Sequence, residues 1–187
     1  KNDVSMLSMG ANAFACSRFL KGVCLQSLTT MGGSAFWYCQ GLKHVDLRGA
    51  PLTAIPHSAF YACSALTDVH LNEGLVKIGP YAFTETKLHH IRIPSSVTAI
   101  GPHAFRSTLL EEVTLDIERV KKGCFRACTQ LRVVVLRGVT CVEENAFSHS
   151  GVRAVAGLHN VDVIHGNAFA FTDLKSVNVR GEVFENA

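Results

Sequence analysis

The pair Ala-Phe, or a close variant of it, recurs along the whole chain at intervals of 20 to 24 residues. The recurring phenylalanines are Phe14, Phe36, Phe60, Phe83, Phe105, Phe125, Phe147 and Phe169. Sequences that repeat at this period fold as stacks of similar coils, because a unit of about 22 residues cannot bury its own apolar face. The spacing therefore predicts a repeat solenoid with one continuous core.

Other positions recur at fixed offsets from each phenylalanine. Met, Ile or Val stands five residues before it, and Ser, Thr or Cys stands three residues after it. Residues three apart share one side of a helix, so we predict one helical turn around each Ala-Phe. An alternating apolar pair such as Val45 and Leu47 then predicts a short half-buried strand, followed by an extended return segment. The strands are expected to form one parallel sheet and to centre on Val23, Val45, Val69, Ile91, Val113, Val134, Val155 and Val177.

One stretch shows the unit most clearly: Leu88-His-His-Ile-Arg-Ile-Pro-Ser-Ser-Val-Thr-Ala-Ile-Gly-Pro-His-Ala-Phe-Arg-Ser-Thr108. This pattern resembles the BspA-like leucine-rich repeats, also called the Treponema pallidum type, and the resemblance extends over essentially all 187 residues. It implies an α/β leucine-rich-repeat solenoid, a right-handed horseshoe with short parallel strands on its concave side and short helical turns and loops elsewhere. Departures include Cys124 in place of the usual Ala and a one-residue insertion at 156–158.

The repeats indicate a single array over residues 1–187, with eight units and a truncated ninth. Val183 through Ala187 matches Val142 through Ala146, so the pattern stops one residue before the next phenylalanine. We therefore expect the sequence to be a fragment of a longer chain. Gly32, Gly79 and Gly101 share one repeat position and are interpreted as turn residues that need a positive φ.

The seven cysteines include no pair with CxxC spacing. Cys39, Cys63 and Cys128 occupy the position that other units fill with Ser or Thr, which favours buried thiols over disulfides. Cys39 and Cys63 would nonetheless lie in adjacent coils, close enough for a bridge. Free thiols favour a reducing, cytoplasmic compartment, with the cell surface as the alternative.

Outward positions on the strands form two zones. Charged and histidine side chains gather over the early units at His44, His70 and His90, with Asp46 and Asp68 among them. A smaller apolar zone follows, and its candidate binding residues are Arg132, Val133, Val135, Arg137, Arg153 and Ala154, with Ala156 and Lys175 beside them. We predict that these zones contact a protein partner.

The histidine zone has two possible interpretations. Imidazole and carboxylate groups are plausible zinc ligands, but side chains spaced along a strand ladder are not fixed in a tetrahedron. We therefore favour a solvated ladder of opposite charges and predict no metal and no cofactor. The same histidines could make partner binding sensitive to pH.

Composition and motifs exclude several classes of function. The chain has no Gly-x-Ser-x-Gly, no phosphate-binding glycine loop and no His-Glu-x-x-His, and Cys24 is the one candidate nucleophile, with no predicted base beside it. The net charge is +3, with Lys and Arg spread evenly, so no nucleic acid is expected. The sequence contains no run of 18 apolar residues, so we expect no segment of it to insert into a membrane.

The sequence thus predicts a non-enzymatic module that binds protein. We favour a docking or structural subunit of a larger assembly. The alternative, which the resemblance implies, is an extracellular or cell-surface adhesin that binds host or matrix proteins.

Overall fold

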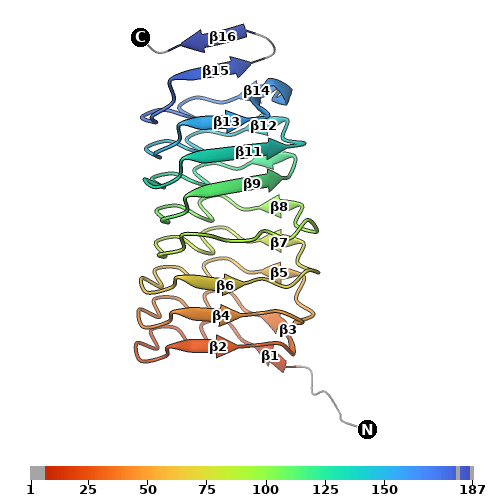
Figure 1. Cartoon of the computed structure of the whole chain (residues 1–187). Helices are drawn as coiled ribbons and strands as arrows, with labels where there is room; N and C mark the ends of the chain where they lie inside the picture. The colour runs from red at the N-terminus through yellow and green to blue at the C-terminus, as the bar shows by residue number, and fades with distance from the viewer. Residues whose placement is uncertain (1–6, 180–181, 186–187) are drawn as a thin grey trace.

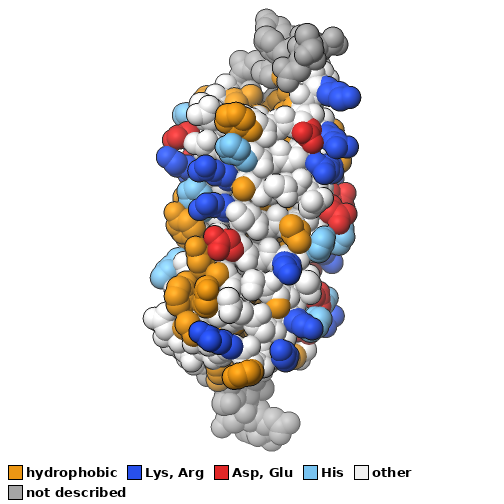
Figure 2. All heavy atoms as spheres, turned by 90° about the vertical axis from the view of Figure 1, so that its left-hand side faces the viewer, with side chains coloured by type: hydrophobic (Ala, Val, Ile, Leu, Met, Phe, Trp, Pro, Cys, Tyr) orange, Lys and Arg blue, Asp and Glu red, His pale blue; other side chains and the backbone are white. Residues whose placement is uncertain are grey.

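The structure is a computed structural model that describes residues 7–179 and 182–185. The chain winds into a column of stacked coils, close to straight in the two perpendicular views of Figures 1 and 2. This parallel β-solenoid, with almost no helix, confirms the predicted fold class. Within the described residues the one helical element is a short 3-10 turn, η1 (Leu158–Asn160), and it accommodates the predicted insertion by placing Gly157 at φ +86°.

Two ladders of short strands run the length of the column (Figure 1). The front ladder contains β2 (Gly22–Cys24), β4 (His44–Asp46), β6 (Asp68–His70), β9 (Glu112–Asp116), β11 (Val133–Arg137), β13 (Ala154–Ala156) and β15 (Ser176–Val179). The rear ladder contains β1 (Leu7–Met9), β3 (Leu28–Met31), β5 (Ala54–Ile55), β7 (Lys77–Ile78), β8 (Ala99–Ile100), β10 (Arg119–Val120), β12 (Cys141–Val142) and β14 (Val163–Ile164). The predicted return segments are thus themselves strands.

The front ladder is not the single sheet that we predicted. Strands β2, β4 and β6 form one parallel sheet, and β9, β11 and β13 form another. The segment around Ile91 forms no strand. Pro94 follows directly after this segment, and proline has no N–H to donate to a ladder. At the far end, β15 pairs antiparallel with β16 (Glu182–Glu185), so the expected parallel pairing around Val177 is also wrong.

The truncated ninth unit was expected at residues 183–187, and residues 186 and 187 lie outside the described part. The division into eight units and a partial ninth, and the expectation of a longer parent chain, stay predictions.

The phenylalanines form one stacked spine through the core. Successive rings lie 5.1–5.4 Å apart, with interplanar angles of 5–11°. The six inner side chains, Phe36, Phe60, Phe83, Phe105, Phe125 and Phe147, are fully buried. Phe14 is 43% exposed, because only one described ring stacks on it, and Phe169 is partly buried.

Each phenylalanine sits in tight turns rather than in the helical turn that we predicted. The residues two before and two after every phenylalanine have φ between +52° and +60°, and all but Gly123 are non-glycine. Alternate N–H groups bond within the coil and to the next coil. Thr84 N–H, for example, donates to Tyr81 O, whereas Phe83 N–H donates to Ala104 O. In an α-helix all of these N–H groups would donate to carbonyls of the same segment. Here half of them donate to the next coil instead, so hydrogen bonds between coils replace those of a helix.

The interpretation of Gly32, Gly79 and Gly101 is also wrong, since none of them has a positive φ. They lie where neighbouring coils approach closely. A Cβ on Gly101 would lie 2.5 Å from Pro80 N, and one on Gly79 would lie 2.7 Å from His57 N. Close backbone approach therefore explains this glycine position.

Candidate functional site

The outward side chains of the front ladder form the candidate binding face, which we call the front face. Parallel pairing places residues of successive strands side by side, as in His44 with Asp68 and Val133 with Ala154. Because alternate residues of a strand point to opposite sides, residues flanking the buried Val45, Val69 and Val134 face solvent. The register confirms that outward residues align in two columns within each three-stranded sheet, for example Cys24, Asp46 and His70. No strand pairing within the described residues extends these columns to His90 and Arg92 or to β15.

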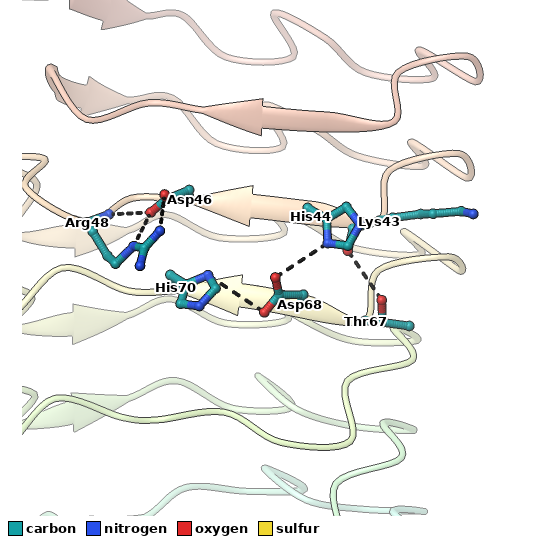
Figure 3. A network of polar contacts seen from close by, with 7 residues as sticks. All are labelled: Lys43, His44, Asp46, Arg48, Thr67, Asp68 and His70. Carbon is teal, nitrogen blue, oxygen red and sulfur yellow. Dashed lines mark hydrogen bonds and ion pairs between the residues drawn. The ribbon is translucent and has the colours of Figure 1, made fainter.

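A network of charged residues covers β4 and β6 (Figure 3). Asp68 lies between two histidines, with its Oδ2 3.4 Å from His44 Nδ1 and its Oδ1 3.7 Å from His70 Nδ1. The Arg48 side chain donates to both oxygens of Asp46, at 2.9 and 2.7 Å. This guanidinium holds the pKa of Asp46 well below its usual range. We call His44, Asp46, Arg48, Asp68 and His70 the histidine patch.

His90 is not part of this network. It is exposed on the segment that forms no strand, whereas its neighbour His89 lies 3.2 Å from Glu111 through Nδ1 and Oε1. No group of three or more His, Cys, Asp or Glu residues in the described ranges is arranged to hold a metal ion. The histidine patch is thus a set of solvent-accessible pairs, and ion pairs in contact with solvent add little to stability.

The apolar patch, Val133, Val135, Ala154 and Ala156, lies on β11 and β13. Val133 is 41% exposed and pairs with Ala154, and Val135 pairs with Ala156. Glu112 and Thr114 of β9 continue these two columns. The structure thus brings small and branched apolar side chains together on an otherwise polar face.

The arginines around the apolar patch differ in their partners. Arg132 Nη1 and Arg153 Nε lie 3.3 and 3.5 Å from the same oxygen of Asp173. Arg137 is exposed beside Asp116 in the register, and no ion pair joins it to another described residue. Lys175 is exposed near Arg153 and Asp173. Sequence reasoning missed Asp173, because it precedes a strand and belongs to neither outward column.

Two grooves between the patches were also missed. They flank the segment around Ile91, have volumes of about 340 and 330 Å³, and share Arg92 and Pro94. The one available signal was Pro94, but the same Ile-x-Ile-Pro pattern is the best match to the repeat consensus. A pattern of residue types therefore did not distinguish this coil from its neighbours.

The cysteines support packing rather than catalysis or bridging. All seven are free. Cys63 Sγ donates to Phe36 O of the preceding coil at 3.0 Å, whereas Thr108 Oγ1 donates to Phe105 O of its own coil at 3.0 Å. Thiol and hydroxyl thus both bond to carbonyls of the phenylalanine spine. Cys24 is exposed, and none of the hydrogen bonds among the described side chains gives its sulfur a base.

We expect two of the seven cysteines to react with a thiol reagent in the native protein and the other five to be protected. Cys16 and Cys24 are exposed and should react with a bulky disulfide reagent at neutral pH, whereas the five buried thiols should react only after denaturation. Burial raises the pKa of Cys128 to about 11, which leaves very little reactive thiolate. Mass spectrometry of labelled native protein would check this. A bridge between Cys39 and Cys63 would contradict it.

Figure 2 shows the side of the column on which the coils turn into the front ladder. Basic, acidic and histidine side chains alternate along this side, without one large basic area. No helix in the described ranges is both long enough and apolar enough to cross a bilayer.

Comparison with known proteins agrees with this architecture. The profile of the BspA type Leucine rich repeat region matches six copies, over residues 2–51 and 53–175. A leucine-rich repeat protein from Bacteroides ovatus is 25% identical with a TM-score of 0.69, and the match covers 93% of this chain and 52% of that one. The T. pallidum leucine-rich repeat protein is 27% identical with a TM-score of 0.62, over 73% of this chain and 66% of that one.

The chain thus spans about half the length of the Bacteroides protein and about two thirds of the T. pallidum protein. No curated protein matches the sequence. The profile match covers most of the chain and agrees with the stacked phenylalanines and paired strands described above. The chain therefore belongs to the BspA-type leucine-rich repeat family.

Proposed function

We propose that this chain is a non-enzymatic protein-interaction module that binds its partner through the front face, as a docking or structural subunit of a larger assembly. The observation that carries the proposal is the apolar patch, where Val133 stays 41% exposed in the middle of a regular ladder. Binding energy concentrates in a few desolvated contacts that polar groups surround. The patch and its arginine rim have this composition.

The scaffold supports such a role. The strands β9 and β11 pair over five residues, so the patch lies on regular backbone rather than on a loop. Preorganised side chains lose little conformational entropy when a partner binds. We propose an intracellular location, which the seven free thiols support, since disulfides are rare in reducing compartments.

A double substitution tests the proposal. Val135→Asp with Arg153→Asp places negative charge in the apolar patch and should weaken partner binding at least tenfold, which corresponds to about 1.4 kcal/mol. Thermal stability should change little, because Arg153 is exposed and Val135 is only partly buried. Binding would be quantified by pull-down and then by biolayer interferometry with the captured partner.

Lys77→Asp with Ala99→Asp is the matched control. It changes the net charge by the same amount, and both residues lie paired on the exposed side of the rear ladder. Lost binding in the front variant alone supports the proposal. If the rear variant loses binding and the front variant does not, the partner uses the rear ladder instead.

A further inference from the structure

The interruption of the front ladder leaves backbone groups without partners. Residues 90–93 lie between β6 and β9, and none of their N–H or C=O groups takes part in the backbone hydrogen bonds of the described chain. The neighbouring strands are paired on their other sides, β6 with β4 and β9 with β11. The interruption is therefore local, with regular sheet on both sides.

A groove lies on each side of this segment. Groove A, of about 340 Å³, has Val69, Leu71 and Pro94 among its lining residues, together with Arg48, His70 and Arg92. Groove B, of about 330 Å³, is lined by Ile91, Ile93 and Val113 together with Arg92, Asp116 and Arg137. Each groove thus combines apolar side chains with charged ones.

The apolar side chains beside the grooves are slightly less buried than Val45 and Val134 of the regular sheet. Val45 and Val134 are 1% and 0% exposed where the sheet is regular. Val69 is 7% exposed beside groove A, and Ile91 and Ile93 are only partly buried. When a ligand covers apolar surface in a concave site, the free energy of the complex falls, which favours binding.

We propose that grooves A and B bind an extended peptide segment of a protein partner, with large apolar side chains at two positions i and i+2. Neighbouring strands lie about 4.8 Å apart, so grooves on the two sides of one extended segment are separated by roughly 5–10 Å. Side chains i and i+2 of an extended chain lie on one face about 6.6 Å apart. A segment that crosses the front ladder therefore inserts one side chain into each groove.

Charge complementarity defines a third position of the peptide. Arg48 is held by Asp46, and Arg92 lies 3.4 Å from Glu73. Arg137 lines groove B on the β11 side, next to Asp116 in the register, and no ion pair joins it to another described residue. An acidic residue at i+4 would lie on the same face of the peptide, beyond groove B, and would pair with Arg137. The segment is thus apolar-x-apolar-x-acidic.

This inference rests on the proposed use of the front face, and its test uses a defined probe. A displayed library of linear twelve-residue peptides would be selected against the whole chain, and the enriched peptides would be synthesised and titrated. We expect the alternating apolar pair followed by Asp or Glu. Thr114→Trp fills groove B from β9 and should weaken these peptides at least tenfold. Thr129→Trp, at another exposed position that lines neither groove, should leave their affinity unchanged.

A charge exchange makes the test independent of folding. Arg137→Glu should weaken the acidic peptides at least fivefold, and a peptide with Lys at i+4 should regain affinity for that variant. Absence of enriched peptides, a consensus without alternating apolar residues, or equal binding to the two tryptophan variants would overturn the proposal. These variants keep Val135 and Arg153, so peptide failure together with partner loss in the double aspartate variant would reject the grooves and retain the front face.

Discussion

Replacing Phe83 by alanine should lower the free energy of unfolding by about 3–5 kcal/mol, the range for truncating a buried aromatic side chain. Phe83 is fully buried, and its ring stacks on Phe60 and on Phe105, both at 5.3 Å. The substitution therefore removes two ring contacts and leaves a cavity between coils. Urea unfolding followed by circular dichroism would measure the loss.

The position of the damage is a second readout of the same variant. Each coil of a repeat protein contacts only its neighbours, so amide exchange should accelerate most in the turns that hold Phe60 and Phe105. Phe14→Ala is the matched control, because its ring is 43% exposed and has one described stacking partner, Phe36. Equal losses for the two variants would show that the spine is not the main source of stability.

The repeat spacing was sufficient to predict the core. Phe36 through Phe147 are buried and stacked because identical units in a stack place identical residues over one another. The outward columns followed from the same register, which is why His44 meets Asp68 and Val133 meets Ala154. Sequence reasoning therefore located the histidine and apolar patches, whose role in binding remains a proposal.

Two of the wrong predictions, the helical turn and the strand at Ile91, concern features that depend on contacts between coils. The three-residue spacing of Phe and Thr fits a helical turn, yet Phe83 N–H donates to Ala104 O of the next coil. A local pattern in one segment carries no information about such a bond. The interruption at Ile91 is similar, because strand propensity is nearly the same in Ile91 and Val113 and only pairing with neighbours separates them.

Gly101→Ala provides the second large effect, a loss of about 1–3 kcal/mol, as expected when an atom is forced into a packed interior. The added Cβ would lie 2.5 Å from Pro80 N and 2.8 Å from Gly79 C, and both are backbone atoms of the preceding coil. Backbone cannot rotate away as a side chain can, so the two coils must separate. The same separation would strain the hydrogen bond from Gly101 N–H to Ile78 O, now 2.8 Å long.

Gly74→Ala is the matched control, because the nearest atom to its added Cβ would be Asn72 Nδ2 at 3.6 Å. That variant should be neutral or slightly stabilising, since alanine has less conformational freedom than glycine in the unfolded chain. Urea unfolding of both variants isolates the contact between coils from the general effect of removing a glycine. Four other units carry a Cβ at the equivalent position, at Pro56, Lys121, Glu143 and His165. If Gly101→Ala proves as stable as Gly74→Ala, this coil adjusts its path as those coils do, and coil spacing is not limited by this contact.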